Sequence, residues 1–410
     1  DPDIVTGYNI QNFDWPYLTD RAKQIGCKEF CVLGRYIGEH SSAKEVTKNI
    51  KVLGQREGKE VAIPGVINYD MLVSIQTEYK LRSYTLNAVS AHFLGDQKED
   101  VHYSMISKLQ KGTPADRHRL AIYCIKDAYL PLQLMNKLLS LMTSLELSRV
   151  CHVPLNFLLN RGQQIRVFSQ LLHKANLRNM IIPAVKSAQV EDKYQGATVI
   201  EPKTGYYTTP IPTLDFASLY PSIMIAHNIC YSTLIRPGSR VDVEYDTSPN
   251  EKRFVKKEAI SGVLPEILTE LLSARKETRK ILEQETDPFK KTVLNCRQLA
   301  LKVSANSVYG FTGATVGKLP CLDISESVTA YGRAMIDLTQ RLVEEKYTVE
   351  HGYEHDAKVV YGDTDSVMVN SCVVDIGEAN KKAIELSNAI SKKYTHLKLG
   401  IDYIFLKMLL

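Results

Sequence analysis

The spacing of apolar residues over the first 150 positions predicts mainly helices after a short mixed segment. Residues 1–36 alternate short apolar runs with turns, a pattern typical of an α/β segment. The polar stretch from Ser41 to Lys59 predicts a loop. Farther on, apolar positions recur at three- and four-residue steps, most regularly at Leu130, Leu134, Leu138, Leu141 and Leu145. We interpret this stripe, between Tyr129 and Leu147, as the core-packing face of an amphipathic helix.

The middle of the chain predicts short strands, then a buried strand and a helical hairpin. Prolines and glycines punctuate residues 183–212, which therefore predict short strands and turns. The next segment, TLDFASLYPSIMIAHNI, predicts a short buried strand that leads into a helix. Two long helical patterns between residues 264 and 309 are joined by the turn Glu285-Thr286-Asp287-Pro288, which predicts an αα-hairpin.

The last part of the chain predicts two helices separated by a β-hairpin. A helical pattern covers residues 324–346, and another covers about 377–395. Between them, KVVYGDTDSVMV places two apolar, β-branched runs around a polar tip, as in a β-hairpin. This order of strands and helices indicates an α+β fold.

Length and composition limit the class of protein. The 410 residues suffice for two to four domains, and 44% hydrophobic with 24% charged residues excludes a disordered or fibrous chain. No apolar run reaches eighteen residues, so no membrane-spanning segment is predicted. The eight cysteines form no CxxC pair, so neither zinc nor disulfides are predicted, and a reducing compartment is expected.

Both ends of the sequence indicate an internal piece of a longer protein. The chain begins DPDIVTGYNI, without Met and without a signal peptide. It closes on IFLKMLL, an apolar run that we expect to continue into a segment that covers it.

Three acidic residues are candidates for a divalent-metal site. Asp363 and Asp365 lie at the tip of the predicted β-hairpin, and residues two apart in an extended chain face the same side, so both carboxylates can meet one cation. Asp215 lies in the predicted buried strand, where a carboxylate needs a cationic partner. The alternatives are a polar turn or a calcium loop for the first two, and a structural ion pair for Asp215.

The predicted helical hairpin concentrates positive charge. Residues 251–302 hold twelve Lys and Arg against eight Asp and Glu, a net charge of +4 in a chain of net charge +5. The residues that share helix faces are Arg275 with Arg279, and Lys302 with Asn306 and Tyr309, followed by Gly310. A solvated face is the ordinary explanation, but this mixture also suits a triphosphate with a flat base beside it. With the three acids, it predicts an in-line phosphoryl transfer assisted by two metal ions.

Three segments resemble the signature motifs of family B DNA polymerases. They are DFASLYPSIMIAHNI, KVSANSVYG and YGDTDS, in the order that the family has. Four further segments are similar to cellular members of the family: GQQIRVFSQLL, YQGATVIEP, GFTGATVGKLPCLDIS and YKLRSYTLNAVSAHFLG. The alternatives are a large-virus member of the family and a catalytically silent, polymerase-like scaffold.

The resemblance implies an α+β protein with a partial RNase H-like exonuclease domain of the DEDDy type and a polymerase domain whose thumb is missing. The implied parts are the exonuclease domain at 1–150, a connecting region at 151–212, the palm at 213–260 and 311–410, and the fingers hairpin at 261–310.

For the polymerase domain, the resemblance implies a role for each matching residue. Asp215, Asp363 and the backbone of Phe216 hold two Mg²⁺ ions, with Asp365 as the adjacent acid of the same motif. The residues implied to contact the triphosphate are Phe216, Ala217, Ser218, Leu219, Arg275, Arg279 and Lys302. Lys302 is also the candidate general acid, and Tyr220 lies under the sugar, where its ring collides with a 2′-hydroxyl. Asn306 supports the nucleotide site, and Tyr309 with Gly310 lines the nascent base pair.

The resemblance also implies contacts with DNA outside that site. Tyr194, Gly196 and Ala197 match a motif that touches the template strand. Asp14 and Asp127 match metal ligands of a 3′–5′ exonuclease, and Tyr123 matches the residue that orients its attacking water. The first exonuclease motif, an Asp-x-Glu on a leading strand, would lie before Asp1, so proofreading is expected only in the full-length protein.

The expected function is template-directed DNA synthesis in chromosomal replication and repair. Primer–template DNA, deoxynucleotides, accessory subunits and a sliding clamp are the partners that the resemblance implies, and the nucleus is the implied location. Iron–sulfur or zinc modules are expected only in a later part of the protein. Asp402 falls near a further palm acid of the family, but GIDYIFLKMLL matches loosely, and we do not assign it a role.

Overall fold

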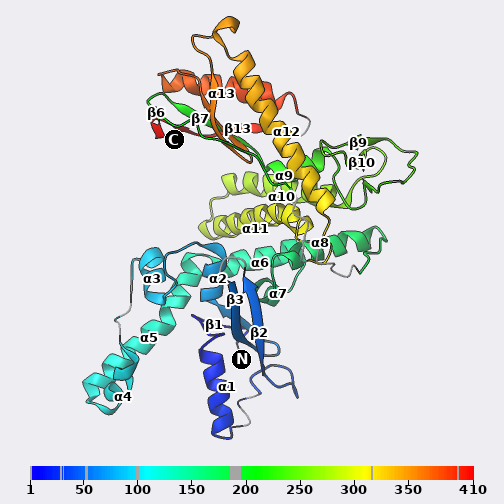
Figure 1. Ribbon diagram of the computed structural model, residues 1–410. Helices are drawn as coiled ribbons and strands as arrows, with labels where there is room; N and C mark the ends of the chain where they lie inside the picture. Colours follow the sequence, from blue (N-terminus) through cyan, green and yellow to red (C-terminus); the bar gives the residue numbers. More distant parts are fainter. Residues whose placement is uncertain are drawn as a thin grey trace. The chain divides into compact units, whose positions relative to one another are not determined.

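The computed structural model (Figure 1) describes the chain from residue 2 to residue 410, except 28–29, 31, 51–53, 98, 100, 185–194, 315–316 and 395–396. It divides into two units, one of residues 1–149 and 153–161, the other of residues 150–152 and 162–410. Each unit is described by itself. Among the described residues, no helix combines the length and the apolar character needed to cross a membrane.

The first unit combines a small parallel sheet with helices. Strand β1 (Ile4–Gly7) pairs in parallel with β4 (Ile67–Asp70). The helices are α1 (Asp14–Gln24), α2 (Met71–Glu78), α3 (Leu86–Leu94), α4 (Tyr103–Lys111), α5 (Pro114–Lys137), α6 (Ser140–Cys151) and α7 (Leu155–Asn160). Tyr69, Leu130 and Leu134 are fully buried in its core, which confirms that the leucine stripe packs inside.

Two predictions for this unit are wrong in detail. The stretch predicted as a loop forms an antiparallel pair, β2 (Ser42–Ile50) with β3 (Gly54–Ala62). These strands pair only with each other among the described strands, so no second sheet neighbour imposes an apolar pattern on them. The single helix predicted through the leucine stripe is two, α5 and α6, because the backbone turns left-handed at Leu139, where φ is 53°.

The second unit is built on a five-stranded sheet in the order β13-β7-β12-β11-β5, with every neighbouring pair antiparallel. Its strands are β5 (Val199–Ile200), β7 (Ile211–Phe216), β11 (Lys358–Asp363), β12 (Ser366–Asn370) and β13 (Leu399–Phe405). Helix α12 (Leu322–Lys346) packs along β11 and β12, and α13 (Ile376–Ser391) packs along β7 and β13. The predicted β-hairpin, β11–β12, is confirmed.

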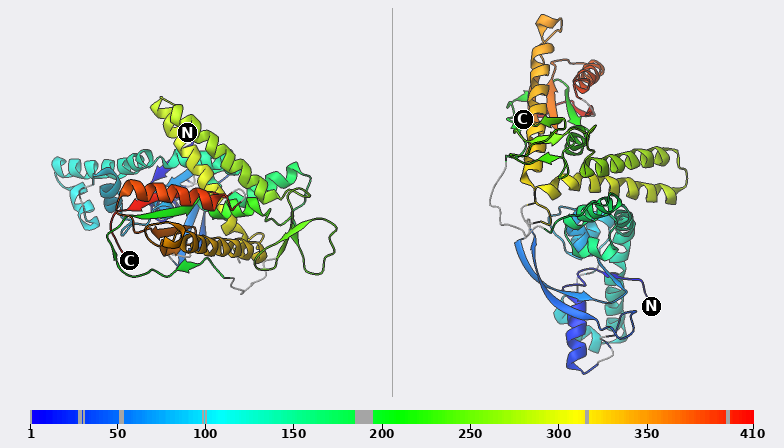
Figure 2. Two further views of the ribbon diagram at one scale, coloured as in Figure 1. Left: turned by 90° about the horizontal axis from the view of Figure 1, so that it is seen from above. Right: turned by 90° about the vertical axis from the view of Figure 1, so that its right-hand side faces the viewer.

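A helical layer adjoins this sheet. Helix α9 (Leu219–Ala226) follows β7, and α10 (Val263–Gln284) and α11 (Pro288–Thr312) form the predicted αα-hairpin, which extends away from the sheet (Figure 2). Helix α8 (Gln164–Leu177) packs against both hairpin helices, and one apolar cluster runs through all of them and the sheet. The remaining strands are β6 (Tyr206–Tyr207), β8 (Leu234–Ile235), β9 (Tyr245–Thr247), β10 (Arg253–Val255) and β14 (Met408–Leu409).

Candidate functional site

The predicted acids of the second unit meet at one end of its sheet. Asp215, the penultimate residue of β7, lies opposite Ser366 of β12 and Gly400 of β13. The N–H of Phe216 donates to the carbonyl of Asp365 at 2.8 Å. Asp363 ends β11 and pairs with the same Ser366. The strand order therefore brings Asp215 beside Asp365 and places Asp363 at the same end of the sheet, although the sequence separates Asp215 widely from the other two.

A tight turn holds Asp363 and Asp365. The N–H of Asp365 donates to the Asp363 carbonyl at 2.6 Å, and Thr364 between them is left-handed, with φ of 55°. The Thr364 hydroxyl donates to one Asp363 carboxylate oxygen at 2.8 Å. The polar turn that was the alternative explanation is thus present, and the Asp363 side chain remains exposed at its tip.

The acids crowd one another electrostatically. Burial, together with the negative charges of Asp365 and Asp402, raises the pKa of Asp215 to about 6. Burial and the charge of Asp363 also raise the pKa of Asp365. Asp402 follows Gly400, the residue opposite Asp215, by two positions, and the β13 register shifts between Ile401 and Tyr403. The pairing of β13 with β7 therefore associates Asp402 with Asp215, and no local sequence pattern indicates that pairing.

The turn between β7 and α9 presents its backbone beside these acids. Phe216 and Leu219 are buried, whereas Ala217 between them is exposed. Ser218 adopts a left-handed conformation with φ of 51° and immediately precedes α9, and its carbonyl accepts from the N–H of Ser222. The N–H of Ala217 donates to the Lys398 carbonyl at 2.9 Å, which fixes the turn to the chain just before β13.

The cationic residues lie on the helical hairpin as predicted. On α11, Lys302, Asn306 and Gly310 are exposed, while the opposite face is buried. On α10, Arg279 is exposed and Arg275 is half-buried, with its Nε 3.5 Å from Oε1 of Gln298 on α11. Burial and the nearby Arg279 charge lower the pKa of Arg275, so the two guanidinium groups share one region.

Two tyrosines connect the turn to the hairpin. The ring of Tyr220 on α9 lies against the ring of Tyr309 on α11, with centroids 4.3 Å apart and planes tilted by 36°. The structure therefore brings the candidate sugar-binding residue and the candidate base-pair residue into contact.

The predicted template-contacting segment is held by α12. Arg333 donates to the carbonyls of Gln195, at 3.0 Å, and Gly196, at 2.6 Å. Gly196 and Ala197 are exposed, and Tyr194 lies outside the described residues.

The predicted exonuclease residues belong to the first unit. Asp14 begins α1, and its pKa is raised by burial and also by the charge of Asp127, which places these two acids near each other. Tyr123 and Asp127 stand one turn apart on α5. The structure thus associates the two candidate ligands across unrelated stretches of sequence.

Sequence reasoning missed a buried acid beside this pair. Asp70 caps α2, and its carboxylate accepts hydrogen bonds from the backbone N–H groups of Asn9, Gln11 and Leu72 at 2.8–3.1 Å. Burial, chiefly, and the charge of Asp14 raise its pKa. Its contacts fix the loop that leads into α1. An Asp directly before a short helical run is the capping signal that could have indicated it.

No set of three or more His, Cys, Asp or Glu side chains is arranged as a metal site within the part of the chain that the structure describes. The acids interact in pairs instead: Asp215 with Asp365 and with Asp402, Asp365 with Asp363, and Asp14 with Asp127.

Comparison with known protein families identifies the class of protein. Residues 153–410 match the model of DNA polymerase family B, and residues 1–89 match its exonuclease domain. The chain therefore belongs to DNA polymerase family B, which confirms the resemblance of its motifs.

The chain is similar, in particular, to catalytic subunits of DNA polymerase delta. It is 54% identical to that of Schizosaccharomyces pombe over 417 residues and 53% identical to that of Drosophila melanogaster over 420 residues; each comparison covers 100% of this chain and 38% of the relative. It is 55% identical to that of Dictyostelium discoideum over 382 residues, or 92% of this chain and 35% of the relative. The chain thus spans little more than a third of the length of these relatives.

Proposed function

We propose that this chain is the central part of a DNA-directed DNA polymerase of the delta type, which adds deoxynucleotides to a primer 3′-hydroxyl on a DNA template. The observation that carries the proposal is that Asp215 and Asp365 lie together at the end of the sheet. Their proximity, together with burial, raises the pKa of Asp215. The corresponding cellular role is chromosomal DNA replication and repair, and the corresponding location is the nucleus.

Divalent metal ions fit the acidic end of the sheet. Asp215, Asp365 and Asp402 place negative charge where burial already disfavours it, and a bound cation relieves that repulsion. Carboxylate and backbone carbonyl oxygens are the ligands that Mg²⁺ accepts in phosphoryl-transfer sites. We propose Asp215, Asp363 and the Phe216 carbonyl as ligands. Bound Mg²⁺ would supply Lewis-acid stabilisation of the entering and leaving oxygens.

The cations of the hairpin suit the triphosphate. In the proposed reaction, the primer 3′-oxygen forms a bond to the α-phosphorus, the bond from that phosphorus to the bridging oxygen breaks, and pyrophosphate leaves with the electron pair. The hydroxyl proton passes to water. Arg275, Arg279 and Lys302 bind the phosphates, and Lys302 donates a proton to the leaving pyrophosphate. The turn from Phe216 to Leu219, with Ala217 exposed, lies along the phosphates in this proposal.

The tyrosine pair suits the sugar and the base. Tyr220 occupies the space that a 2′-hydroxyl needs, so the site favours deoxynucleotides. Tyr309 and Gly310 line the new base pair, and Asn306 supports the nucleotide site. The contact of Tyr220 with Tyr309 supports this assignment, because the two rings adjoin and can contact the sugar and the base of one nucleotide together.

The proposed division of the chain follows the family. Residues 1–150 belong to an RNase H-like exonuclease domain, 151–212 connect, 213–260 and 311–410 form the palm, and 261–310 form the fingers. Asp14, Asp127 and Tyr123 take part in 3′–5′ proofreading in the full-length protein. Gly196 and Ala197, with Tyr194, contact the template, and accessory subunits and a sliding clamp are the protein partners.

Primer extension by the full-length protein tests the proposal. Asp215→Ala removes a metal ligand, and we expect extension to fall by about a thousandfold or more, since such a ligand acts on the transition state. Asp242→Ala, a change at an exposed acid of the same unit, serves as the matched control and leaves the rate unchanged. Equal rates for the Asp215→Ala protein and the wild type contradict the proposal and favour a catalytically silent scaffold.

A further inference from the structure

A row of polar residues lies on α8 where this helix packs against α10 and α11. Gln170, Lys174 and Arg178 follow one another at four-residue steps, and so share one side of the helix. Around them the contact is apolar, since Val167 and Leu171 of α8 join the buried cluster of the hairpin. Three polar side chains in such a contact call for a specific explanation.

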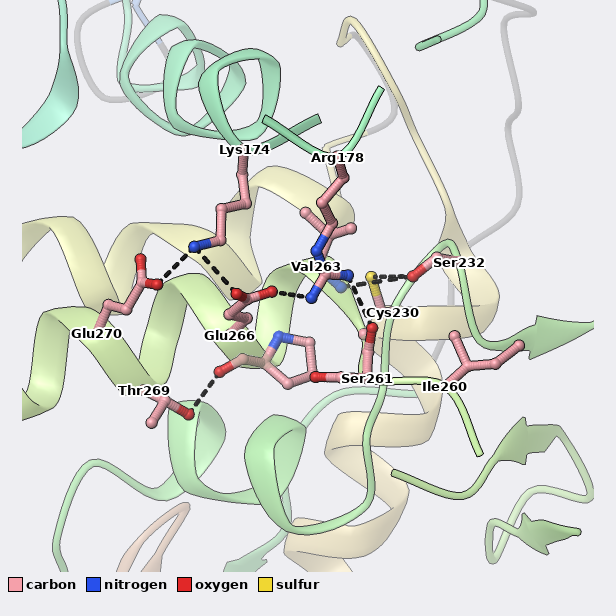
Figure 3. A network of polar contacts seen from close by, with 12 residues as sticks. Lys174, Arg178, Cys230, Ser232, Ile260, Ser261, Val263, Glu266, Thr269 and Glu270 are labelled. Atoms are coloured by element: carbon pink, nitrogen blue, oxygen red, sulfur yellow. Dashed lines mark hydrogen bonds and ion pairs between the residues drawn. The ribbon is translucent and has the colours of Figure 1, made fainter. Parts of the chain in front are cut away.

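Lys174 and Arg178 both bind the start of α10 (Figure 3). The Lys174 ammonium lies 3.0 Å from a carboxylate oxygen of Glu266 and 2.5 Å from one of Glu270, and only 13% of its side chain is exposed. Arg178 forms an ion pair with Glu266 and donates to the Ser261 carbonyl at 2.9 Å. Two cations therefore hold the first turns of α10 and the Ser261 carbonyl, two residues before the helix.

Gln170 binds the second helix of the hairpin. Its Nε2 donates to the Ser304 hydroxyl at 2.8 Å and to the Val150 carbonyl at 3.0 Å. Ser304 is fully buried and stands midway between Lys302 and Asn306 on α11. The row thus fixes both helices of the hairpin, and on α11 it does so directly behind the exposed candidate nucleotide-binding residues.

Polar contacts of this kind select one geometry. Apolar side chains gain free energy in many relative positions, because burial is not directional. The buried Gln170–Ser304 hydrogen bond and the largely buried Lys174 ammonium are costly unless their partners meet in good geometry, so they disfavour a slipped or rotated helix. The Glu270 side chain itself is mostly exposed. Glu270 precedes Arg275 by five residues, a rise of about 7.5 Å along the helix. The contact therefore lies less than two helical turns before Arg275 on the same helix.

We propose that Gln170, Lys174 and Arg178 are positioning residues of the nucleotide site, which set the hairpin so that Arg275 and Lys302 meet the triphosphate. This inference rests on the proposed function. None of the three touches the reacting atoms, and their effect passes through Glu266, Glu270 and Ser304. A loosened hairpin binds the nucleotide more weakly, but once the nucleotide is bound the same groups surround it.

Steady-state kinetics of the full-length protein on primed DNA test this inference. Lys174→Met and Glu270→Gln each raise the KM for deoxynucleotide by about three- to tenfold, the size of couplings within one polar network, with kcat within about twofold of wild type. Since both changes break the same contact, the double variant has a KM close to that of the worse single variant. Lys174→Arg keeps the charge and restores a KM near that of the wild type.

Two further measurements separate positioning from stability alone. Hydrogen exchange of residues 263–284 is faster in Lys174→Met than in the wild type, whereas Lys381→Met, which changes an exposed lysine of α13, alters neither exchange nor KM. If Lys174→Met lowers the melting temperature but leaves KM unchanged, the inference is wrong and the row serves stability only. The same result together with an inactive Asp215→Ala protein leaves the proposed function standing. A wild-type protein that does not extend primers overturns both.

Discussion

The rings of Tyr220 and Tyr309 lie 4.3 Å apart, although one residue follows the β7 strand and the other stands near the end of the helical hairpin. Gly332 of α12 backs this pair, because a Cβ atom built there would lie 3.6 Å from the Tyr220 ring. Because Gly332 has no side chain, α12 leaves a methyl-sized space beside the Tyr220 ring. Tyr309 is therefore the aromatic neighbour that this ring contacts directly.

Under the proposed function, the tyrosine pair predicts a preference for deoxynucleotides over ribonucleotides. Tyr220→Ala opens the space beside the sugar, and we expect discrimination against ribonucleotides to fall by about 10- to 100-fold, the range that a single added hydroxyl can give. The ratio of kcat/KM for deoxy- and ribonucleotides measures it. Tyr220→Phe keeps the ring and serves as the control. Unchanged discrimination in Tyr220→Ala would show that another group excludes the 2′-hydroxyl.

The crowded carboxylates predict an effect of metal that can be measured without catalysis. At Mg²⁺ concentrations about tenfold above its dissociation constant, the wild type gains about 1.4 kcal/mol of stability. Asp215→Asn removes one negative charge from the set, so without metal this variant melts at or above the wild-type temperature. With Mg²⁺ the order reverses, because the variant has lost a ligand. Thermal melts in EDTA and in Mg²⁺ measure both effects.

The control for this experiment is Asp242→Asn, at an exposed acid away from the sheet. It should gain as much stability from Mg²⁺ as the wild type. A full gain in the Asp215→Asn protein as well would place the metal elsewhere.

The sequence predicted elements better than their contacts. The hairpin α10–α11 and the β11–β12 turn were evident because their periodicities differ and their turn residues are distinctive. The meeting of Asp215 with Asp365 depends on which strands pair, and no local pattern encodes that pairing. The resemblance to the family's motifs implied that these acids belong to one site, which the periodicity of apolar residues could not indicate.

Local exceptions to periodicity account for the other failures. The leucine stripe continues through Leu138 and Leu141, yet the left-handed Leu139 divides the helix without Gly or Pro to announce it. The β2–β3 pair is held by its own backbone register and needs no apolar alternation. Asp402 joins Asp215 through the pairing of β13 with β7, in which Gly400 lies opposite Asp215, and no local sequence pattern indicates that pairing.

A stacked histidine predicts acid sensitivity of the second unit. His227 lies against the Tyr331 ring, with centroids 3.7 Å apart, and burial lowers the pKa of its imidazole. The unfolded chain then binds a proton more readily than the folded chain, so stability falls as pH drops below about 6.5. His227→Phe keeps the stack without a titrating group. Its melting temperature should fall less between pH 7.5 and pH 5.5, by on the order of 2–4 °C.

An exposed histidine of the same unit supplies the comparison. His355→Phe makes the same change at that exposed position and serves as the control for the substitution itself. If the His227→Phe protein loses as much stability in acid as the wild type does, other groups are responsible for the acid sensitivity.

The contacts of Asn228 predict how much the segment before α10 depends on this one side chain for its stability. The residue is 2% exposed, its Nδ2 donates to the carbonyls of Val255 and Ile260 at 2.8 Å, and its Oδ1 accepts from the Gly262 N–H at 2.8 Å. Asn228→Asp is nearly isosteric but replaces the two donors by an acceptor that faces two carbonyl oxygens. We expect the free energy of unfolding to fall by about 3 kcal/mol, since buried polar groups left unpaired cost about 1–3 kcal/mol each.

Denaturant unfolding measures this loss of stability. The control is Asn388→Asp, at an exposed position of α13, which should change the free energy of unfolding by less than about 0.5 kcal/mol. An equally small effect at Asn228 would mean that the chain before α10 is held by its apolar contacts rather than by this amide.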